Sequence, residues 1–217
     1  MSNFLGAWTD NGAYYYGRNP MTTADAATWF SKMGAANVPV QYLQLDPWWF
    51  GQQKGWFPNP NFFPNGLADL VANGTHTPLL LYSFHWPAGT AATYYDRFNV
   101  SFTFEESMPY ANHGYRTIMY QISAADSEAF YDLNFGLYTD VMMATEIDFL
   151  NWQTLMYRNW TTRLDEATQA APVTRWLAGM AAAAQKRGYP VQMCMSLREF
   201  GGCCFACSRL DGGRTAW

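Results

Sequence analysis

Two aspartates in this chain close apolar segments that look like β-strands. Asp46 ends the run Val40-Gln41-Tyr42-Leu43-Gln44-Leu45 and is followed by Pro47-Trp48-Trp49-Phe50, and Asp148 closes Ala144-Thr145-Glu146-Ile147 in the same manner. In a barrel of parallel strands the reactive side chains stand at the carboxyl-terminal tips, where the loops form the active-site face. Two such carboxylates beside aromatic rings are typical of a barrel that cleaves sugars.

The two aspartates suit different roles in that chemistry. A retaining glycosidase needs one ionised carboxylate as nucleophile and one protonated carboxylic acid about 5 Å away for the leaving group. Asp148 fits the nucleophile, although it could instead cap a helix at Asn151-Trp152 or pair with an arginine. Asp46 fits a binder of sugar hydroxyls, because a carboxylate accepts two hydrogen bonds from a vicinal diol. Alternatively, Asp46 only begins a turn before Pro47.

Aromatic and polar residues at the strand tips are further candidates for substrate binding. Trp48 and Trp49 offer flat apolar faces to sugar C–H bonds and N–H groups to hydroxyls, although one of them could plug the barrel mouth instead. A lone histidine is more often structural than catalytic, so for His85 a contact with substrate is favoured over acid–base catalysis. The remaining candidates, each with packing or a turn as its alternative role, are Trp8, Asp10, His85 and Trp86.

Glu146 lies two residues before Asp148 and therefore faces the same side of its strand. An ionised glutamate inside a barrel is costly without a partner such as Arg158 or Arg163. We therefore expect Glu146 either to pair in this way, to lie at the rim, or to share a proton with Asp148.

Periodicity and turn signals predict alternating strands and helices. This alternation indicates parallel strands with right-handed crossovers, hence an α/β fold, a partial TIM (β/α)8-type barrel of about five βα units. No period emerges from Pro87 to Ala125, which we interpret as an active-site insertion. The expected strands are Phe4–Trp8, Val40–Asp46, Thr77–Phe84, Met143–Phe149 and Pro190–Ser196, and the expected helices are Ala26–Ala36 with Thr22–Asp25 as its cap, Asn65–Ala72, Asp126–Met142 and Ala170–Arg187 with Gly188 as its C-cap.

Composition narrows the function further. The 217 residues are 49% hydrophobic and 18% aromatic, with 10 Trp, which is enough for one core with rings left over for a site. A net charge of -4 disfavours nucleic acid and anionic membranes as partners, and no apolar run reaches the ~20 residues that span a bilayer. All four cysteines follow residue 193, and Cys204-Phe-Ala-Cys207 lacks a second ligand pair. We expect neither a metal nor a cofactor.

The motifs together resemble the clan of retaining α-galactosidases and raffinose-synthase-like glycosidases, whose catalytic domain is a (β/α)8 barrel. The first-strand segment 5–11, the second-strand segment Tyr42-Leu43-Gln44-Leu45-Asp46-Pro47-Trp48-Trp49, and the phrase Phe62-Phe63-Pro64-Asn65-Gly66-Leu67 before Leu79-Leu80-Leu81-Tyr82 follow the clan's order. Glu146-Ile147-Asp148-Phe149 stands where the clan has a Lys-x-Asp strand. The resemblance covers residues 4 to 196 and implies an oligosaccharide or glycoside substrate, with Asp148 as the nucleophile.

Two departures from the clan pattern shape the functional hypotheses. Glu146 replaces the lysine that binds substrate hydroxyls, and no Arg-x-x-x-Asp segment carrying the general acid follows Ser196. We expect residues 1–196 to be a partial glycosidase-like barrel domain and residues 197–217 to be an atypical tail rich in Cys, Gly and Arg. The leading hypothesis is a retaining hydrolase of α-linked sugars with an incomplete catalytic domain. The alternatives are a non-catalytic carbohydrate-binding relative and a truncated, inactive fragment.

Overall fold

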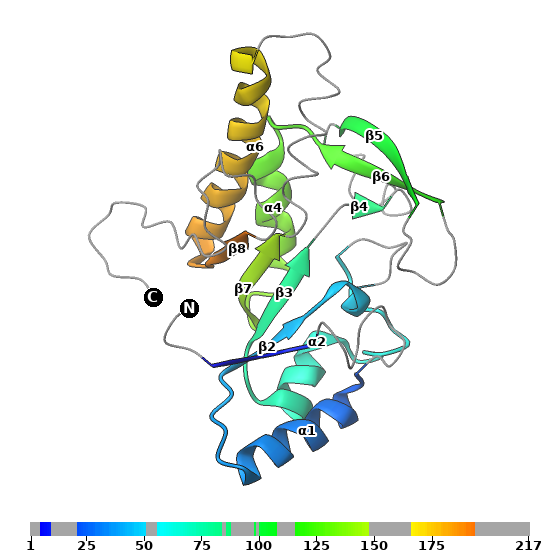
Figure 1. The fold of residues 1–217 in the computed structure, drawn as a ribbon, viewed down its shortest axis with the longest axis vertical. Helices are drawn as coiled ribbons and strands as arrows, with labels where there is room; N and C mark the ends of the chain where they lie inside the picture. The colour runs from blue at the N-terminus through cyan, green and yellow to red at the C-terminus, as the bar shows by residue number, and fades with distance from the viewer. Residues whose placement is uncertain are drawn as a thin grey trace, which may run out of the picture.

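A five-stranded parallel sheet forms the centre of the molecule (Figure 1). The computed structural model describes residues 5–9, 21–50, 56–83, 86–87, 98, 100–107, 116–147 and 166–193. Within these ranges the strand order is β1-β2-β3-β7-β8, and every neighbouring pair is parallel. The predicted α/β class with parallel barrel-type strands is therefore confirmed. The strands are β1 (Gly6–Trp8), β2 (Tyr42–Leu45), β3 (Leu79–Ser83), β7 (Met142–Ile147) and β8 (Val191–Met193).

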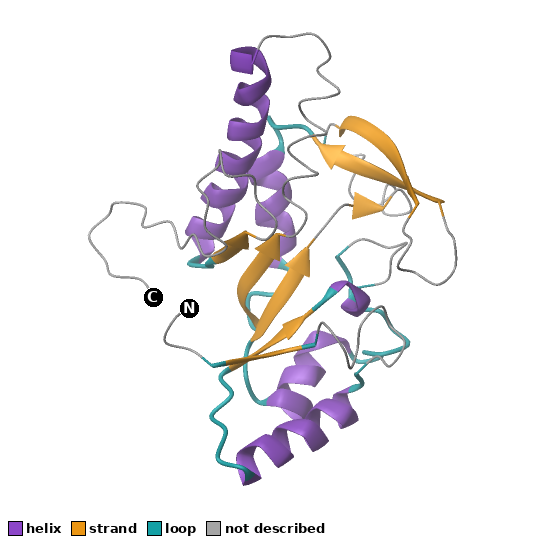
Figure 2. Ribbon diagram, in the orientation of Figure 1, coloured by secondary structure: helices purple, strands orange, loops and turns teal. Residues whose placement is uncertain are grey.

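Helices connect the successive parallel strands. Figure 2 shows them in two groups, one beside β1 and β2 and the other beside β7 and β8. The first group is α1 (Thr23–Ala35), the 3-10 turn η2 (Pro47–Trp49), and α2 (Gly66–Asp69), which continues into the π-helical turn η3 (Leu70–Thr75). The second group is α4 (Ser127–Gly136) and α6 (Glu166–Arg187). None of the helices in the described ranges is long and apolar enough to cross a membrane.

Local sequence signals explain where two of these helices begin and end. The Thr22 side chain accepts a hydrogen bond from the backbone N–H of Asp25, and the Asp25 carboxylate accepts one from the backbone N–H of Thr22. This capping box satisfies two otherwise unpaired donors, so α1 begins directly after Thr22. At the other end of the chain, Gly188 has a φ of +71°, the left-handed conformation that ends α6 as predicted.

The core is built mainly on strands β2 and β3. Leu79, Leu80 and Leu81 are all fully buried, as expected for a parallel strand that is covered on both faces. On β2, Leu43 and Leu45 are fully buried, and the strand alternation turns them away from Gln44 between them. The β2 face that carries Gln44 is therefore the one on which polar residues gather.

A second, antiparallel sheet interrupts the connection between β3 and α4. Its strands are β4 (Trp86–Pro87), β5 (Val100–Ser107) and β6 (Arg116–Ile122), in the order β4-β6-β5. The expectation that residues 87 to 125 have no period is wrong, because the segment 100–104 alternates apolar and polar residues with a period of two. Since β4 begins three residues after β3 ends, this sheet starts at the carboxyl end of β3 (Figure 1).

Helices α4 and α6 approach each other closely at small residues. A Cβ atom at Gly179 would lie 2.7 Å from the backbone nitrogen of Glu128 and 2.8 Å from the Cβ of Ser127. The Ser127 hydroxyl donates a hydrogen bond of 2.7 Å to the Trp176 carbonyl. Glycine at position 179 thus permits this contact between the two helices.

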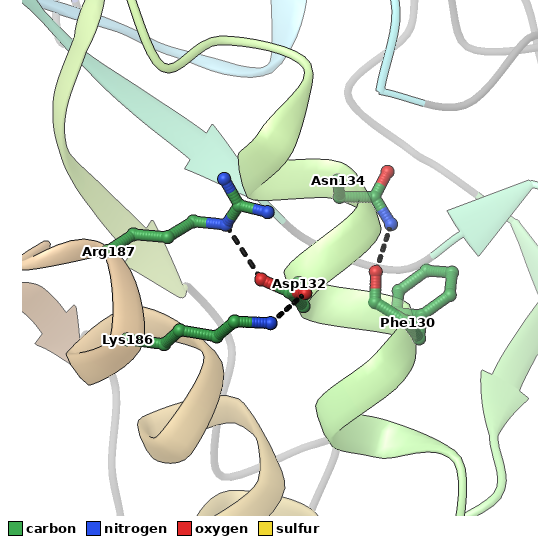
Figure 3. A network of polar contacts seen from close by, with 5 residues as sticks. All are labelled: Phe130, Asp132, Asn134, Lys186 and Arg187. Carbon is green, nitrogen blue, oxygen red and sulfur yellow. Dashed lines mark hydrogen bonds and ion pairs between the residues drawn. The ribbon is translucent and has the colours of Figure 1, made fainter.

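An ion pair joins the middle of α4 to the C-terminal end of α6. Figure 3 shows Lys186 and Arg187 of α6 converging on Asp132 of α4, with nitrogen–oxygen distances of 2.7 and 2.8 Å. Arg187 passes over Gly136, where a Cβ would lie 2.8 Å from its Nη2 atom. The hydrogen bond from Lys186 is the largest cause that lowers the pKa of Asp132, and Arg187 lowers it further against the opposing effect of burial.

The close helix contact predicts opposite effects for two glycine-to-alanine substitutions. Gly179→Ala should destabilise the fold by about 1–3 kcal/mol, because α4 and α6 must move apart. Gly34→Ala is the matched control, since a Cβ there meets nothing within 4 Å; it should be neutral or stabilising by up to about 1 kcal/mol. Thermal unfolding checks both, and equal Tm values for the two variants would contradict the helix contact.

The ion pair predicts a pH-dependent effect of Asp132→Asn. Because the folded-state pKa of Asp132 is lowered, its contribution is present above about pH 4 and disappears as the pH falls through the folded pKa. Denaturant unfolding should show the variant less stable by about 0.2–1 kcal/mol at pH 7, with the difference vanishing in acid. High salt should shrink the difference at pH 7, and a difference that grows in acid would refute this assignment.

Candidate functional site

Asp46 stands at the carboxyl end of β2 and is buried, with 4% of its surface exposed. Its backbone is extended, with φ of -81° and ψ of 178°, and it directly precedes the turn η2. Proline at position 47 favours this extended conformation in the residue before it and also suits the first turn of a helix. The Asp-Pro sequence therefore ends the strand while keeping the carboxylate at its tip.

Thr9, directly after β1, holds this tip in place. Its hydroxyl accepts hydrogen bonds from the Trp48 indole N–H at 3.2 Å and from the Asp46 backbone N–H at 3.4 Å. The hydroxyl proton points to the Gln44 carbonyl at 3.1 Å or to the Asp46 carboxylate at 3.5 Å. One buried threonine thus orients both the carboxylate and the neighbouring tryptophan.

A second carboxylate, Glu146 on β7, lies inside the same sheet with 3% of its surface exposed. Its Oε2 atom accepts a hydrogen bond of 2.6 Å from the Gln44 amide on β2. Its Oε1 atom accepts one of 3.3 Å from the Gln192 amide on β8. The sequence predicted that Glu146 pairs with an arginine, lies at the rim or shares a proton with Asp148. Among the described residues, the side chains that donate to its carboxylate include the neutral amides of Gln44 and Gln192.

The polar face of the sheet is arranged in layers. Tyr42, Gln44 and Asp46 follow one another at spacings of two on β2 and so face the same side. Gly6 pairs with Tyr42 and Trp8 pairs with Gln44. The Tyr42 ring occupies the space where a Cβ at Gly6 would lie, and burial raises the pKa of its phenol. Trp8 remains 52% exposed, which leaves its ring available for contact.

The predicted aromatic pair lies next to the Asp46 carboxylate but is packed within the protein. Trp49 is fully buried, and its indole N–H donates to the Tyr82 carbonyl at 3.1 Å. The Trp56 indole N–H donates to the same carbonyl at 2.9 Å. Trp48 packs against Phe63 with ring centroids 5.6 Å apart. In this arrangement both members of the pair anchor the loop after β2 to the strand tips.

The predicted site residues divide into those that the structure describes and those that lie outside the described residues. Asp46, Trp48 and Trp49 come together at the tip of β2, Glu146 lies on the same face of the sheet, and Trp8 lies on the edge strand β1. Trp86 belongs to β4. The predictions for Asp10, His85 and Asp148 fall outside the described residues and remain predictions.

Sequence reasoning did not select Thr9, Gln44 and Gln192. A polar residue between apolar strand positions, as in Leu43-Gln44-Leu45, is a signal that could have identified Gln44. Gln192 lies between Val191 and Met193 in the same way. That Gln44 and Gln192 both bind Glu146 follows only from the order of the strands in the sheet.

A cavity of the structure lies at the end of the strands opposite to Asp46. Within the described ranges, no group of three or more His, Cys, Asp or Glu side chains lies close enough to hold a metal ion. A cavity of about 340 Å³ is lined by residues that include Phe30, Met33, Val40 and Thr77. Val40 and Thr77 precede β2 and β3, so this cavity lies at the amino ends of the strands, opposite to the end where barrel active sites form.

Comparison with known proteins shows the fold. No family model matches the chain, and no curated protein matches it. Among solved structures, the GH31 dextranase of Flavobacterium johnsoniae complexed with glucose is similar, with 10% identity and a TM-score of 0.56 over 88% of this chain and 25% of that one. A mutant of the same dextranase complexed with isomaltotriose matches with 8% identity and a TM-score of 0.55 over the same shares of the two chains.

The GH31 α-xylosidase from Xanthomonas citri is similar to the same degree, with 12% identity and a TM-score of 0.56 over 88% of this chain and 22% of that one. The chain thus spans about a quarter of the length of these structures. They are glycoside hydrolases, as the sequence resemblance implies, although none of the three is an α-galactosidase. At such low identity the likeness establishes a shared fold, and the five parallel strands are part of a barrel of this type.

Proposed function

We propose that this chain is a glycoside hydrolase-like protein that acts on α-linked sugars by a retaining double displacement. The observation that carries the proposal is the buried Asp46 carboxylate at the carboxyl tip of a parallel strand. The shared fold supports it, since one neighbour is a dextranase complexed with glucose or isomaltotriose and another is an α-xylosidase. We also propose that residues 1–196 constitute a partial barrel domain and that residues 197–217 are an atypical tail rich in Cys, Gly and Arg.

The proposed reaction assigns one role to each acidic strand tip. The Asp148 carboxylate attacks the anomeric carbon while the glycosidic C–O bond breaks, and a carboxylic acid protonates the leaving oxygen. Water then gives a proton to the carboxylate left by that acid and adds to the anomeric carbon, the bond to Asp148 breaks, and the sugar leaves with its original anomeric configuration. Asp46 accepts hydrogen bonds from substrate hydroxyls, in the orientation that Thr9 gives it.

The second candidate function is sugar binding without turnover. Of the described residues, the only buried acidic side chains are Asp46 and Glu146, and both Glu146 oxygens accept amide hydrogen bonds. We assign the binding of sugar hydroxyls to Asp46, and the two amides occupy both oxygens of Glu146, so neither residue is assigned the protonation of a leaving group. A chain that keeps Asp46 at its strand tip without the acid would bind a glycoside and release it intact.

Turnover assays separate the two candidates. We expect the full chain to hydrolyse at least one of an aryl α-glucoside, an aryl α-xyloside and an aryl α-galactoside. Asp148→Asn should lower kcat by at least about 10³-fold, because the nucleophile is lost. Asp140→Asn, an exposed site after α4, is the control and should leave kcat unchanged. Sugar binding with no turnover in the wild-type chain would select the second candidate.

Binding assays test the role of Asp46 under either candidate. Asp46→Asn keeps the side-chain shape but removes a charged acceptor worth about 1.5–3 kcal/mol, so Kd for isomaltotriose should rise roughly 10- to 100-fold. Thr9→Val, which removes the hydroxyl that orients Asp46, should raise Kd in the same direction by a smaller factor. Titration calorimetry measures both, and an unchanged Kd for Asp46→Asn would exclude Asp46 from the sugar site.

A further inference from the structure

Three side chains form one hydrogen-bonded layer across the polar face of the parallel sheet. The layer consists of Gln44 on β2, Glu146 on β7 and Gln192 on β8. Glu146 and Gln192 are direct neighbours in the register of β7 and β8. Gln44 lies two strands away and reaches Glu146 past β3. Glu146 therefore ties together strands from the middle and the edge of the sheet.

The partners of Glu146 suit a fixed carboxylate. An ionised carboxylate that is buried must receive hydrogen bonds, since it has lost those of water. Each of its oxygens accepts one amide N–H, at 2.6 Å from Gln44 and 3.3 Å from Gln192. The two amides are neutral donors, and together they hold the carboxylate in one orientation. A rotation of the Glu146 side chain would break both bonds.

The layer lies directly below the strand tips. Asp46 is two residues after Gln44, and β7 ends at Ile147, the residue after Glu146. At about 3.3 Å per residue, the next position on the same face of a strand lies roughly 7 Å further along. The distance between the tips of β2 and β7 therefore depends on how Gln44 and Glu146 are joined.

We propose that Gln44 and Gln192 are positioning residues, which act through Glu146 to set the spacing between the carboxyl ends of β2 and β7, where the proposed function needs Asp46 and Asp148. This inference rests on the proposed function, because spacing matters where two carboxyl groups work on one sugar. It also changes the role of Glu146: instead of binding the substrate directly, Glu146 lies below the residues that contact the sugar and holds their strands in place. Errors of about 1 Å in such spacing can lower rates by about 10²-fold.

An exchange of the amide and the carboxylate tests the proposal. Gln44→Glu alone places two carboxylates together, and Glu146→Gln alone removes the acceptor charge. The double exchange Gln44→Glu with Glu146→Gln restores an amide–carboxylate bond between β2 and β7, and the amide oxygen at position 146 can still accept from Gln192. Gln185→Glu, at an exposed position of α6, is the control for the added charge.

Each variant is measured in the full chain for Tm, for Kd with isomaltotriose, and for kcat/KM with the aryl α-glycoside that the wild type hydrolyses. We expect each single variant to lower kcat/KM roughly 10- to 100-fold and the double exchange to recover it to within about threefold of the wild type. The control should match the wild type. A purely structural role would lower Tm but leave kcat/KM of the folded chain unchanged.

The possible results separate this inference from the proposed function. Single variants with wild-type kcat/KM overturn the inference alone, as does a double exchange that stays as impaired as Glu146→Gln, since Glu146 would then contact the sugar itself. A wild-type chain that neither binds nor hydrolyses any of the glycosides overturns the proposed function and the role in catalysis with it. In that case a Tm recovered by the double exchange supports the layer as a link between strands, and a Tm that is not recovered overturns the layer as well.

Discussion

The burial of two carboxylates on one face of a parallel sheet is the constraint around which this molecule is arranged. Asp46 and Glu146 are both almost fully buried, and a carboxylate without hydrogen bonds in such a place costs several kcal/mol. Their donors come from strands that are distant in sequence: Thr9 lies within hydrogen-bond distance of Asp46, and Gln44 and Gln192 donate to Glu146. Satisfying these two groups therefore ties β1, β2, β7 and β8 to one another.

Parallel pairing brings the carboxyl ends of the strands, and the loops that follow them, together near Asp46. Because all five strands run in one direction, their carboxyl ends lie at the same end of the sheet, and each loop that follows a strand begins there. The loop after β2 is anchored to this end of the sheet through the indole N–H groups of Trp49 and Trp56, which both donate to the Tyr82 carbonyl. The antiparallel sheet also begins at this end of the parallel sheet, after β3. Loops from β2 and β3 thus start beside the Asp46 carboxylate.

The sequence was sufficient for features that depend on local periodicity and capping. It predicted the parallel strands, the cap at Thr22 and the end of α6 at Gly188, because each depends on a few adjacent residues. It did not predict the partners of Glu146, since they follow from the pairing of strands about 50 and 100 residues away. It also misjudged the strands β5 and β6, where a period of two was present in residues 100–104 but was not recognised.

The neutral partners of Glu146 have an electrostatic consequence for the proposed chemistry. The amides of Gln44 and Gln192 donate to the carboxylate and orient it without adding positive charge. The transition state of glycoside cleavage resembles an oxocarbenium ion and carries positive charge on the sugar ring. A carboxylate that is ionised and already held in place below the strand tips stabilises such charge, because it needs no reorganisation during the reaction. The glutamate at position 146 is therefore compatible with the reaction that we propose.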